Sequence, residues 1–180
     1  MEIKREVEGQ TSIVLYVIRY LLNKIGINVK AKTHRFVDFF IGFDKVETVI
    51  RIFGCETVDI LNDLRVEFVS RIGYMGVNDM DGTIIISADY LKNGDLRDIY
   101  LDVIHELAHV KQFREGRSLF DRRYKYIERA TEIEAYRYAV EEARNIGMTD
   151  AEIFEYLKTE WMSKESHKRL AGTLKVEINE

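Results

Sequence analysis

The first half of the chain contains short stretches in which apolar and polar positions alternate, the pattern of a half-buried β-strand. Residues 28–32 and residues 66–72 alternate in this way. Residues 83–87 (TIIIS) are almost wholly apolar and follow a turn signal at residues 80–82, so they form the strongest strand candidate. We therefore expect the strands of the protein mainly in its first half.

Apolar residues recur at helical spacing in other stretches, and glycines or capping residues mark their ends. In the first half these stretches are residues 12–22, which Gly26 ends, and residues 46–53 and 57–64, which Gly54 separates. In the second half they are residues 95–114, residues 122–145, a helix from Thr149, and a short helix from Ser163 to about Gly172. Residues 174–180 are either a strand or a frayed end.

Side chains that cap helices support the boundaries in the second half. The N-caps we expect are Asn93 or Asp95 for the first helix, Asp121 for the second, and Thr149 in a capping box with Glu152 for the third. Gly116 and Gly147 follow the ends of the first two helices. Strands followed by helices indicate an α+β fold, and 180 residues fit a single domain, residues 1–180.

Composition excludes several classes of protein. Lys and Arg number 27 and Asp and Glu number 31, so the net charge of −4 argues against a generally basic nucleic-acid surface. Cys55 is the one cysteine, which excludes a disulfide scaffold and favours a reducing, cytoplasmic setting. The apolar residues 12–22 contain Arg19 and fall short of the roughly 20 residues that cross a bilayer, so we expect no membrane association.

The predicted helix at residues 95–114 contains the sequence HELAH, a match to the pattern HExxH. Because four residues are just over one helical turn, His105 and His109 leave the same face and can hold one metal ion. Glu106 then projects toward the open side of that metal, where water would bind. The competing interpretation is two ordinary histidines that are hydrogen-bonded to core carboxylates.

A catalytic zinc site needs a third protein ligand and an open fourth position. Position 115, where an extended motif would carry histidine, is glutamate, so we look to the helix predicted at residues 122–145. Helical spacing places Glu128 and Glu132 on one face with alanines that permit close helix packing, whereas Glu134 falls on a solvated face. We expect Glu132 as the third ligand, with Glu128 as an alternative ligand or as a partner that holds a histidine tautomer.

This combination resembles the gluzincin class of zinc metallopeptidases, in which HExxH is followed on the next helix by a glutamate, often as E-x-x-A. Here the second part reads Glu132 to Ala135, and the run EIEAYRYA is similar to segments of CAAX-processing peptidases, small archaeal minigluzincins and bacterial repressor-cleaving metalloproteases. The resemblance covers residues 82–147 and departs at Tyr136, where many members carry Asp or Asn against a metal-bound histidine.

The resemblance implies a zincin-like core at residues 81–147, an N-terminal elaboration at residues 1–80 and a C-terminal helical cap at residues 148–180. It also implies that residues 83–87 form the edge strand that lines the substrate cleft. The implied activity is peptide-bond hydrolysis with one Zn²⁺ and Glu106 as general base. Its substrate would be a peptide or protein.

The sequence leaves several choices open. The electrophile that would assist zinc is one of Tyr124, Tyr126, Tyr136 and His167. The main alternative function is a gluzincin-like regulatory or partner-binding protein with narrow or no general protease activity. A deformylase-type site with Cys55 as ligand and a purely structural zinc site are weaker alternatives. The oligomeric state is not determined by these patterns.

Overall fold

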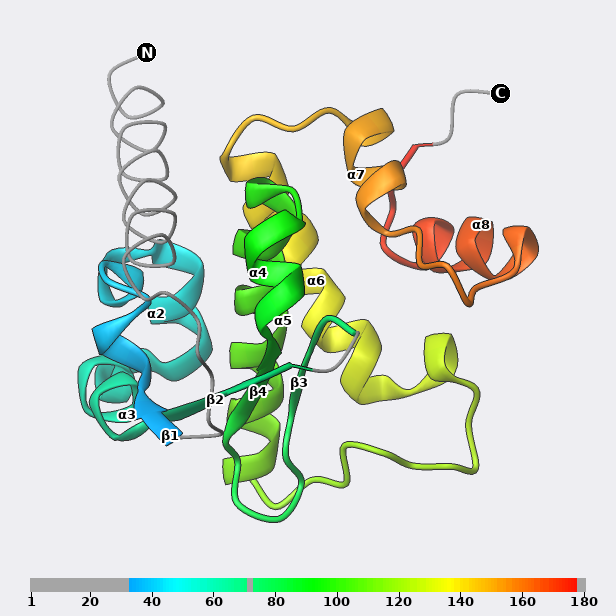
Figure 1. The fold of residues 1–180 in the computed structure, drawn as a ribbon. Helices are drawn as coiled ribbons and strands as arrows, with labels where there is room; N and C mark the ends of the chain where they lie inside the picture. Colours follow the sequence, from blue (N-terminus) through cyan, green and yellow to red (C-terminus); the bar gives the residue numbers. More distant parts are fainter. Residues whose placement is uncertain (1–32, 71–72, 178–180) are drawn as a thin grey trace.

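The computed structural model describes residues 33–70 and 73–177. The helix predicted at residues 12–22 and the strand predicted at residues 28–32 lie outside this range. Within it, short strands in the first half are followed by longer helices in the second, which confirms the α+β class (Figure 1). None of the helices in this range combines the length and apolar character needed to cross a membrane.

The described strands form one four-stranded sheet in the order β1–β2–β4–β3. The strands are β1 (Thr33–Arg35), β2 (Arg65–Val69), β3 (Met75–Val77) and β4 (Ile84–Ser87). β2 and β4 pair in parallel, and β1 and β3 pair antiparallel to them on the two outer sides. β2 and β4 confirm the two strands predicted in this range, but the expectation that residues 83–87 form the edge strand is wrong. β3 forms that edge.

The sequence pattern does not predict β3, because a strand of three residues around a glycine shows no alternation of apolar and polar positions. β3 exists because it pairs with β4 across a tight turn, where Gly82 has a φ of 75° and Asp81 accepts a hydrogen bond from the backbone of Thr83. Three of the four strands therefore precede residue 81, the start of the predicted core.

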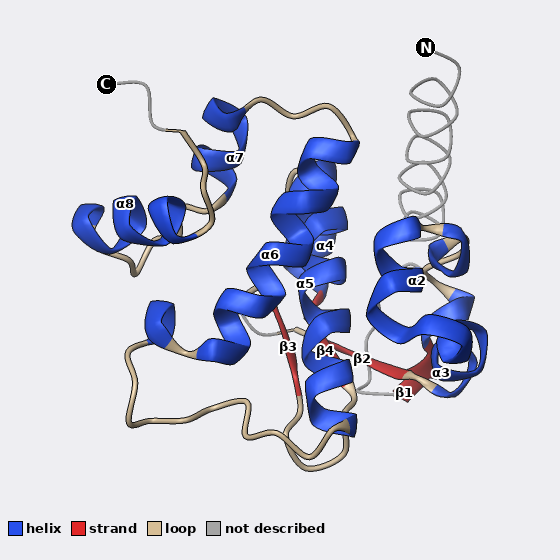
Figure 2. Cartoon of the chain, turned by 180° about the vertical axis from the view of Figure 1, so that it is seen from behind, coloured by secondary structure: helices blue, strands red, loops and turns tan. Residues whose placement is uncertain are grey.

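α5 is the central helix, and α2, α6 and β3 pack against it (Figures 1 and 2). The helices are α2 (Glu47–Phe53), α3 (Thr57–Asp63), α4 (Ala88–Asn93), α5 (Leu96–Arg114), α6 (Ala130–Asn145), α7 (Asp150–Tyr156) and α8 (Lys164–Thr173). Short 3-10 turns occupy residues 36–38, 43–45, 54–56 and 126–128. α6 runs alongside α5, with α2 and α3 on one side of this pair and α7 and α8 on the other (Figure 2).

α5 is buried around most of its circumference, as expected for a helix enclosed by other elements. Ile99, Leu101, Ile104 and Leu107 are all fully buried. On α6, the predicted alanine face packs inward, because Ala135, Ala139 and Ala143 are buried and Glu132 is with them. These small residues let the two helices approach closely, which brings Glu132 against α5.

The start of α6 differs from the predicted one. The helix begins at Ala130 instead of residue 122, and Asp121 is not its N-cap. Asp121 instead accepts hydrogen bonds from the backbone and the guanidinium of Arg123, which stabilises a local turn. The other predicted ends are confirmed: Asp95 caps α5, Thr149 and Glu152 form the capping box of α7, and Ser163 caps α8.

Candidate metal centre

α5 presents three polar residues of the HExxH pattern toward one cavity. Asp95 fixes the start of the helix by accepting hydrogen bonds from the backbone of Arg97 and Asp98. His105 and His109, one turn apart, have Nε2 atoms 3.0 Å from each other. Both histidines are about 6% exposed, so solvent hardly reaches them.

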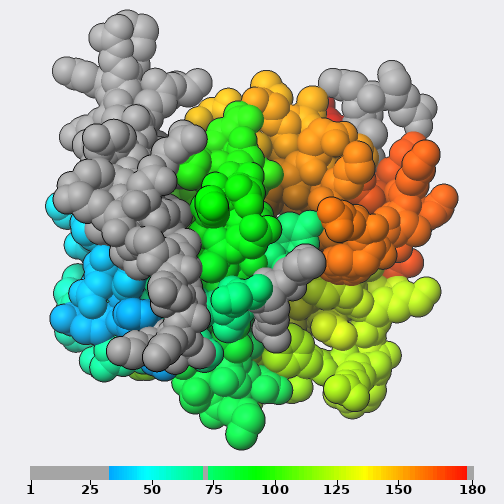
Figure 3. All heavy atoms as spheres, in the orientation of Figure 1, coloured from blue at the N-terminus to red at the C-terminus, as the bar shows by residue number. Residues whose placement is uncertain are grey.

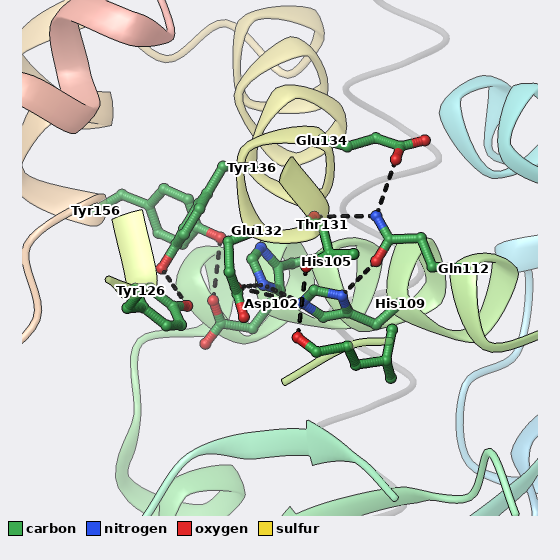
Figure 4. Close-up of polar contacts among 11 residues, drawn as sticks. Asp102, His105, His109, Gln112, Tyr126, Thr131, Glu132, Glu134, Tyr136 and Tyr156 are labelled. Carbon is green, nitrogen blue, oxygen red and sulfur yellow. Dashed lines mark hydrogen bonds and ion pairs between the residues drawn. The ribbon is translucent and has the colours of Figure 1, made fainter. Parts of the chain in front are cut away.

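Glu132, in the first turn of α6, completes this group (Figure 4). Its Oε2 atom lies 3.4 Å from the Nε2 atom of His105 and 3.4 Å from that of His109. The three residues are buried and their ligand atoms converge, so they could hold a metal ion. The Oε2 atom of Glu132 is buried, and it faces the Nε2 atoms of both histidines. The structure therefore brings together His105, His109 and Glu132, the three residues that the sequence predicts as metal ligands.

The electrostatics of this group favour a carboxylate and one protonated imidazole when metal is absent. Burial alone would raise the pKa of Glu132, but contact with the two imidazoles lowers it well below its usual range. Burial lowers the pKa of His105. Burial also acts to lower the pKa of His109, but the carboxylates of Glu132 and Glu106 outweigh it and raise that pKa to about 9.

Glu106 lies beside the group and lines the same cavity. Its side chain is buried, and its Oε2 atom has no hydrogen-bond partner among the described residues. Burial raises its pKa to about 7, and the charge of His109 opposes this shift only in part. A carboxylate with this pKa can take up and release a proton near neutral pH.

The cavity has a volume of about 120 Å³, which is room for more than one water molecule. One wall is the group on α5 and α6, and another is the edge strand β3. Leu119, Phe120 and Tyr126 close the remaining side from the segment between α5 and α6. The sequence analysis did not identify β3, Leu119 or Phe120 as part of this site, because none of them carries a chemical motif.

Gln112 is a further residue of the site that the sequence analysis missed. It is fully buried, and its Oε1 atom lies 2.8 Å from the Nδ1 atom of His109. Gln112 follows His109 by three residues, so helical spacing alone places the two on neighbouring positions of one face. The motif search in the sequence looks for metal ligands, for which a glutamine is unsuited, so it does not single out Gln112.

The imidazole of His105 is held by contacts of a different kind from those of His109. Its Nδ1 atom has no hydrogen-bond partner in the described part of the chain. Tyr136, at the position where the resembling families carry Asp or Asn, packs edge-on against the imidazole with a centroid distance of 4.3 Å. Aromatic packing therefore holds the ring of His105, whereas hydrogen bonding holds the ring of His109.

The four residues predicted as electrophiles lie in different surroundings. Tyr126 lines the cavity, and its hydroxyl lies 3.1 Å from that of Tyr136. Tyr124 is 52% exposed, and its ring faces the guanidinium of Arg123. His167 is buried between α7 and α8, where it stacks on Phe154 and contacts the backbone oxygen of that residue at 2.7 Å. The geometry therefore places Tyr126 and Tyr136 at the site and does not bring Tyr124 or His167 to it.

Glu128, the alternative third ligand, is also directed elsewhere. It lies in the 3-10 turn before α6, so it does not share a helical face with Glu132. Its carboxylate pairs with Arg169 on α8, and Figure 3 shows the C-terminal helices against the segment that precedes α6. Trp161 reinforces this contact by packing edge-on against Tyr126 with centroids 4.6 Å apart.

Cys55 is exposed in the turn at residues 54–56 and does not belong to the metal-binding group.

Asp102 lies one turn before Glu106 on α5 and ties three helices together. It accepts a hydrogen bond of 2.6 Å from Tyr90 on α4. It also accepts one of 3.0 Å from Tyr156 on α7 (Figure 4). Burial raises the pKa of Asp102 to about 6, although both tyrosine hydrogen bonds act against this shift.

Comparisons of the chain with protein-family models, with curated proteins and with solved structures found no match.

Proposed function

We propose that the protein is a zinc-dependent metallopeptidase with a zincin-like core, in which His105, His109 and Glu132 bind one Zn²⁺. The observation that carries this proposal is the convergence of these three buried side chains beside a fourth buried carboxylate, Glu106, at one cavity. Three protein ligands and room for water are typical of a catalytic zinc site, whereas structural zinc sites have four protein ligands.

The separations of the donor atoms suit one tetrahedral ion of the size of zinc. Ligand atoms at about 2.0–2.1 Å from a tetrahedral zinc are roughly 3.3–3.4 Å apart. Two of the three separations are 3.4 Å, and the third, between the two Nε2 atoms, is 3.0 Å. Two imidazoles and one carboxylate are also a donor set that zinc accepts in hydrolases.

Zinc would supply Lewis acidity, which polarises a carbonyl group and makes a water molecule more acidic. Glu106 would act as the general base: its carboxylate takes a proton from the attacking water and then delivers it to the nitrogen of the leaving amine. Tyr126 lines the same cavity, and its hydroxyl is the candidate that would donate a hydrogen bond to the developing oxyanion. Tyr136 contacts that hydroxyl and would orient it.

The edge strand β3 offers a backbone to which an extended peptide can bind. The backbone N–H of Ser87 donates to the oxygen of Tyr74, and that of Asn78 donates to the oxygen of Thr83. In an antiparallel pair, hydrogen-bonded positions alternate with non-bonded ones, so the polar backbone groups of Met75 and Val77 point away from β4. Both residues line the cavity of the metal centre, so a peptide added to this edge would pass the candidate metal site.

The proposal is tested by measuring zinc content and peptide hydrolysis for the wild type and Glu106→Gln. Glu106→Gln should retain one zinc per chain and lose about 10²–10⁴-fold in kcat, because only the proton transfer is removed. Glu155→Gln, at an exposed position of α7, is the control and should behave as wild type. A wild type that binds zinc but cleaves no peptide from a broad library would favour the regulatory alternative. Full activity in Glu106→Gln would refute the mechanism.

A further inference from the structure

Gln112 makes three hydrogen bonds that reach both α6 and the HExxH motif on α5 (Figure 4). Its Oε1 atom lies 2.8 Å from the Nδ1 atom of His109. Its Nε2 atom donates to the backbone oxygen of Thr131 at 3.0 Å and to the carboxylate of Glu134 at 3.1 Å. Since Gln112 is 0% exposed, these bonds do not compete with solvent.

The partners of Gln112 determine which way its amide faces. A backbone carbonyl and a carboxylate are both acceptors, so the NH₂ group of Gln112 must face Thr131 and Glu134. The amide oxygen is then left for His109, and an oxygen can only accept. The Nδ1 atom of His109 must therefore carry the proton in this contact.

We infer that Gln112 is a positioning residue that holds His109 in the tautomer protonated at Nδ1, leaving its Nε2 atom free to bind metal. This inference rests on the proposed metal site. Partners of this kind fix both the tautomer and the orientation of a ligand histidine. Within the described structure the Nδ1 atom of His105 has no such partner. His109 is therefore the ligand histidine whose tautomer a hydrogen bond fixes.

The same amide also positions the third ligand. Thr131, which accepts one of its hydrogen bonds, directly precedes Glu132 in the first turn of α6. The N-cap of α6, Arg129, makes no side-chain capping bond, so that first turn depends on contacts from outside the helix. Gln112 therefore links His109 to the backbone that carries Glu132.

A surface ion cluster holds Gln112 in turn. The carboxylate of Glu134 pairs with Arg117, and its other oxygen lies 3.6 Å from the ammonium group of Lys111. The sequence analysis placed Glu134 on a solvated face, but its side chain is only 28% exposed and anchors this cluster. The chain of contacts from Arg117 through Glu134 and Gln112 to His109 connects the surface to the metal site.

The test measures zinc affinity by competition with a chromogenic chelator. Gln112→Leu should bind zinc about 10–100-fold more weakly than wild type, the usual cost of losing such a partner. Gln112→Glu should also bind weakly, because it keeps an acceptor for His109 but places a second carboxylate against Glu134. In the double variant Gln112→Glu with Glu134→Gln, the amide at position 134 can donate to the carboxylate at position 112. This variant should recover most of the zinc affinity. Glu141→Gln, elsewhere on α6, is the matched control.

A spectroscopic readout separates positioning from general stability. In zinc-loaded wild type, NMR should show a slowly exchanging Nδ1 proton on His109, and Gln112→Leu should lose its protection. Should Gln112→Leu not fold, Glu134→Leu, which removes the acceptor of the Gln112 amide, should still lower zinc affinity several-fold. Wild-type affinity in both Gln112→Leu and Glu134→Leu would overturn the inference while leaving the zinc site intact. A wild type without zinc affinity would instead overturn the proposed function, on which the inference rests.

Discussion

The Nε2 atoms of His105 and His109 lie 3.0 Å apart, and both belong to side chains that are at most 8% exposed. Two imidazole nitrogens this close, with a buried carboxylate against both, form an arrangement that binding of a cation would stabilise. Because the unfolded chain cannot present the three groups together, metal binding should add directly to the stability of the fold.

Zinc should therefore raise the melting temperature of the protein. At free zinc near 1,000 times Kd the gain is about 4 kcal/mol, which is roughly 8–16 °C for a chain of this size. Glu132→Ala should lose most of this shift, whereas Glu141→Ala on the same helix should retain it. Thermal melts with zinc and with a chelator measure the effect, and an equal shift in wild type and Glu132→Ala would contradict the assignment of Glu132.

Zinc binding should also release a proton. The metal-free site raises the pKa of His109 to about 9, so the imidazole is protonated at neutral pH and must lose its Nε2 proton before binding metal. At least about one proton should be released near pH 7.5, because His109 gives up its Nε2 proton there. Calorimetry in buffers of different ionisation enthalpy measures this number. Heats that do not depend on the buffer at pH 7.5 would contradict the prediction.

The edge strand gives a test of how peptide binds. In Met75→Pro the lost N–H is one that points away from β4, so the sheet should survive, as proline is tolerated on an edge. Peptide binding should weaken, with KM raised about fivefold, because a donor worth about 1 kcal/mol is removed. Met75→Ala removes the side chain but keeps the N–H, so it should leave KM near wild type. Equal KM values in the two variants would argue against strand addition at β3.

Asp102 should make stability depend on pH in a defined direction. Its pKa is about 6 in the folded protein, above its ordinary value, so the folded state binds the proton more tightly than the unfolded state. Its stabilising contribution is thus fully present below pH about 4 and is lost as the pH rises through about 6.

Asp102→Asn removes this titration. Relative to that variant, the unfolding free energy of the wild type should fall by about 2 kcal/mol between pH 4 and pH 7.5. Urea unfolding at a series of pH values measures the difference. A difference that stays constant with pH, or that increases with it, would show that burial does not raise the pKa of Asp102.

The sequence predicts the parts of this site that depend on local spacing. HExxH on a capped helix requires both imidazoles to leave one face, and the alanines of α6 identify Glu132 as the inward carboxylate. The sequence does not predict that Gln112 orients His109, although the spacing of three residues places the two side chains on neighbouring positions of one helix. That role requires Thr131 and Glu134, which only the packing of α6 on α5 brings within reach.

The errors at Asp121 and Glu128 share a physical cause. A helix pattern beginning near residue 122 was plausible by composition, but Asp121 closes a turn with Arg123 and Glu128 pairs with Arg169 on α8. Both partners override local helix propensity, and the second is a tertiary contact between residues 41 positions apart. The sequence pattern likewise does not predict β3, since its three residues become a strand only through pairing with β4.

The most direct test of the account is a crystal structure of the zinc-loaded protein with anomalous diffraction recorded at the zinc edge. The account predicts one strong peak within about 2.0–2.2 Å of the Nε2 atoms of His105 and His109 and of a carboxylate oxygen of Glu132. A zinc-loaded protein whose peak lies elsewhere, or lies at the histidines without Glu132, would contradict it.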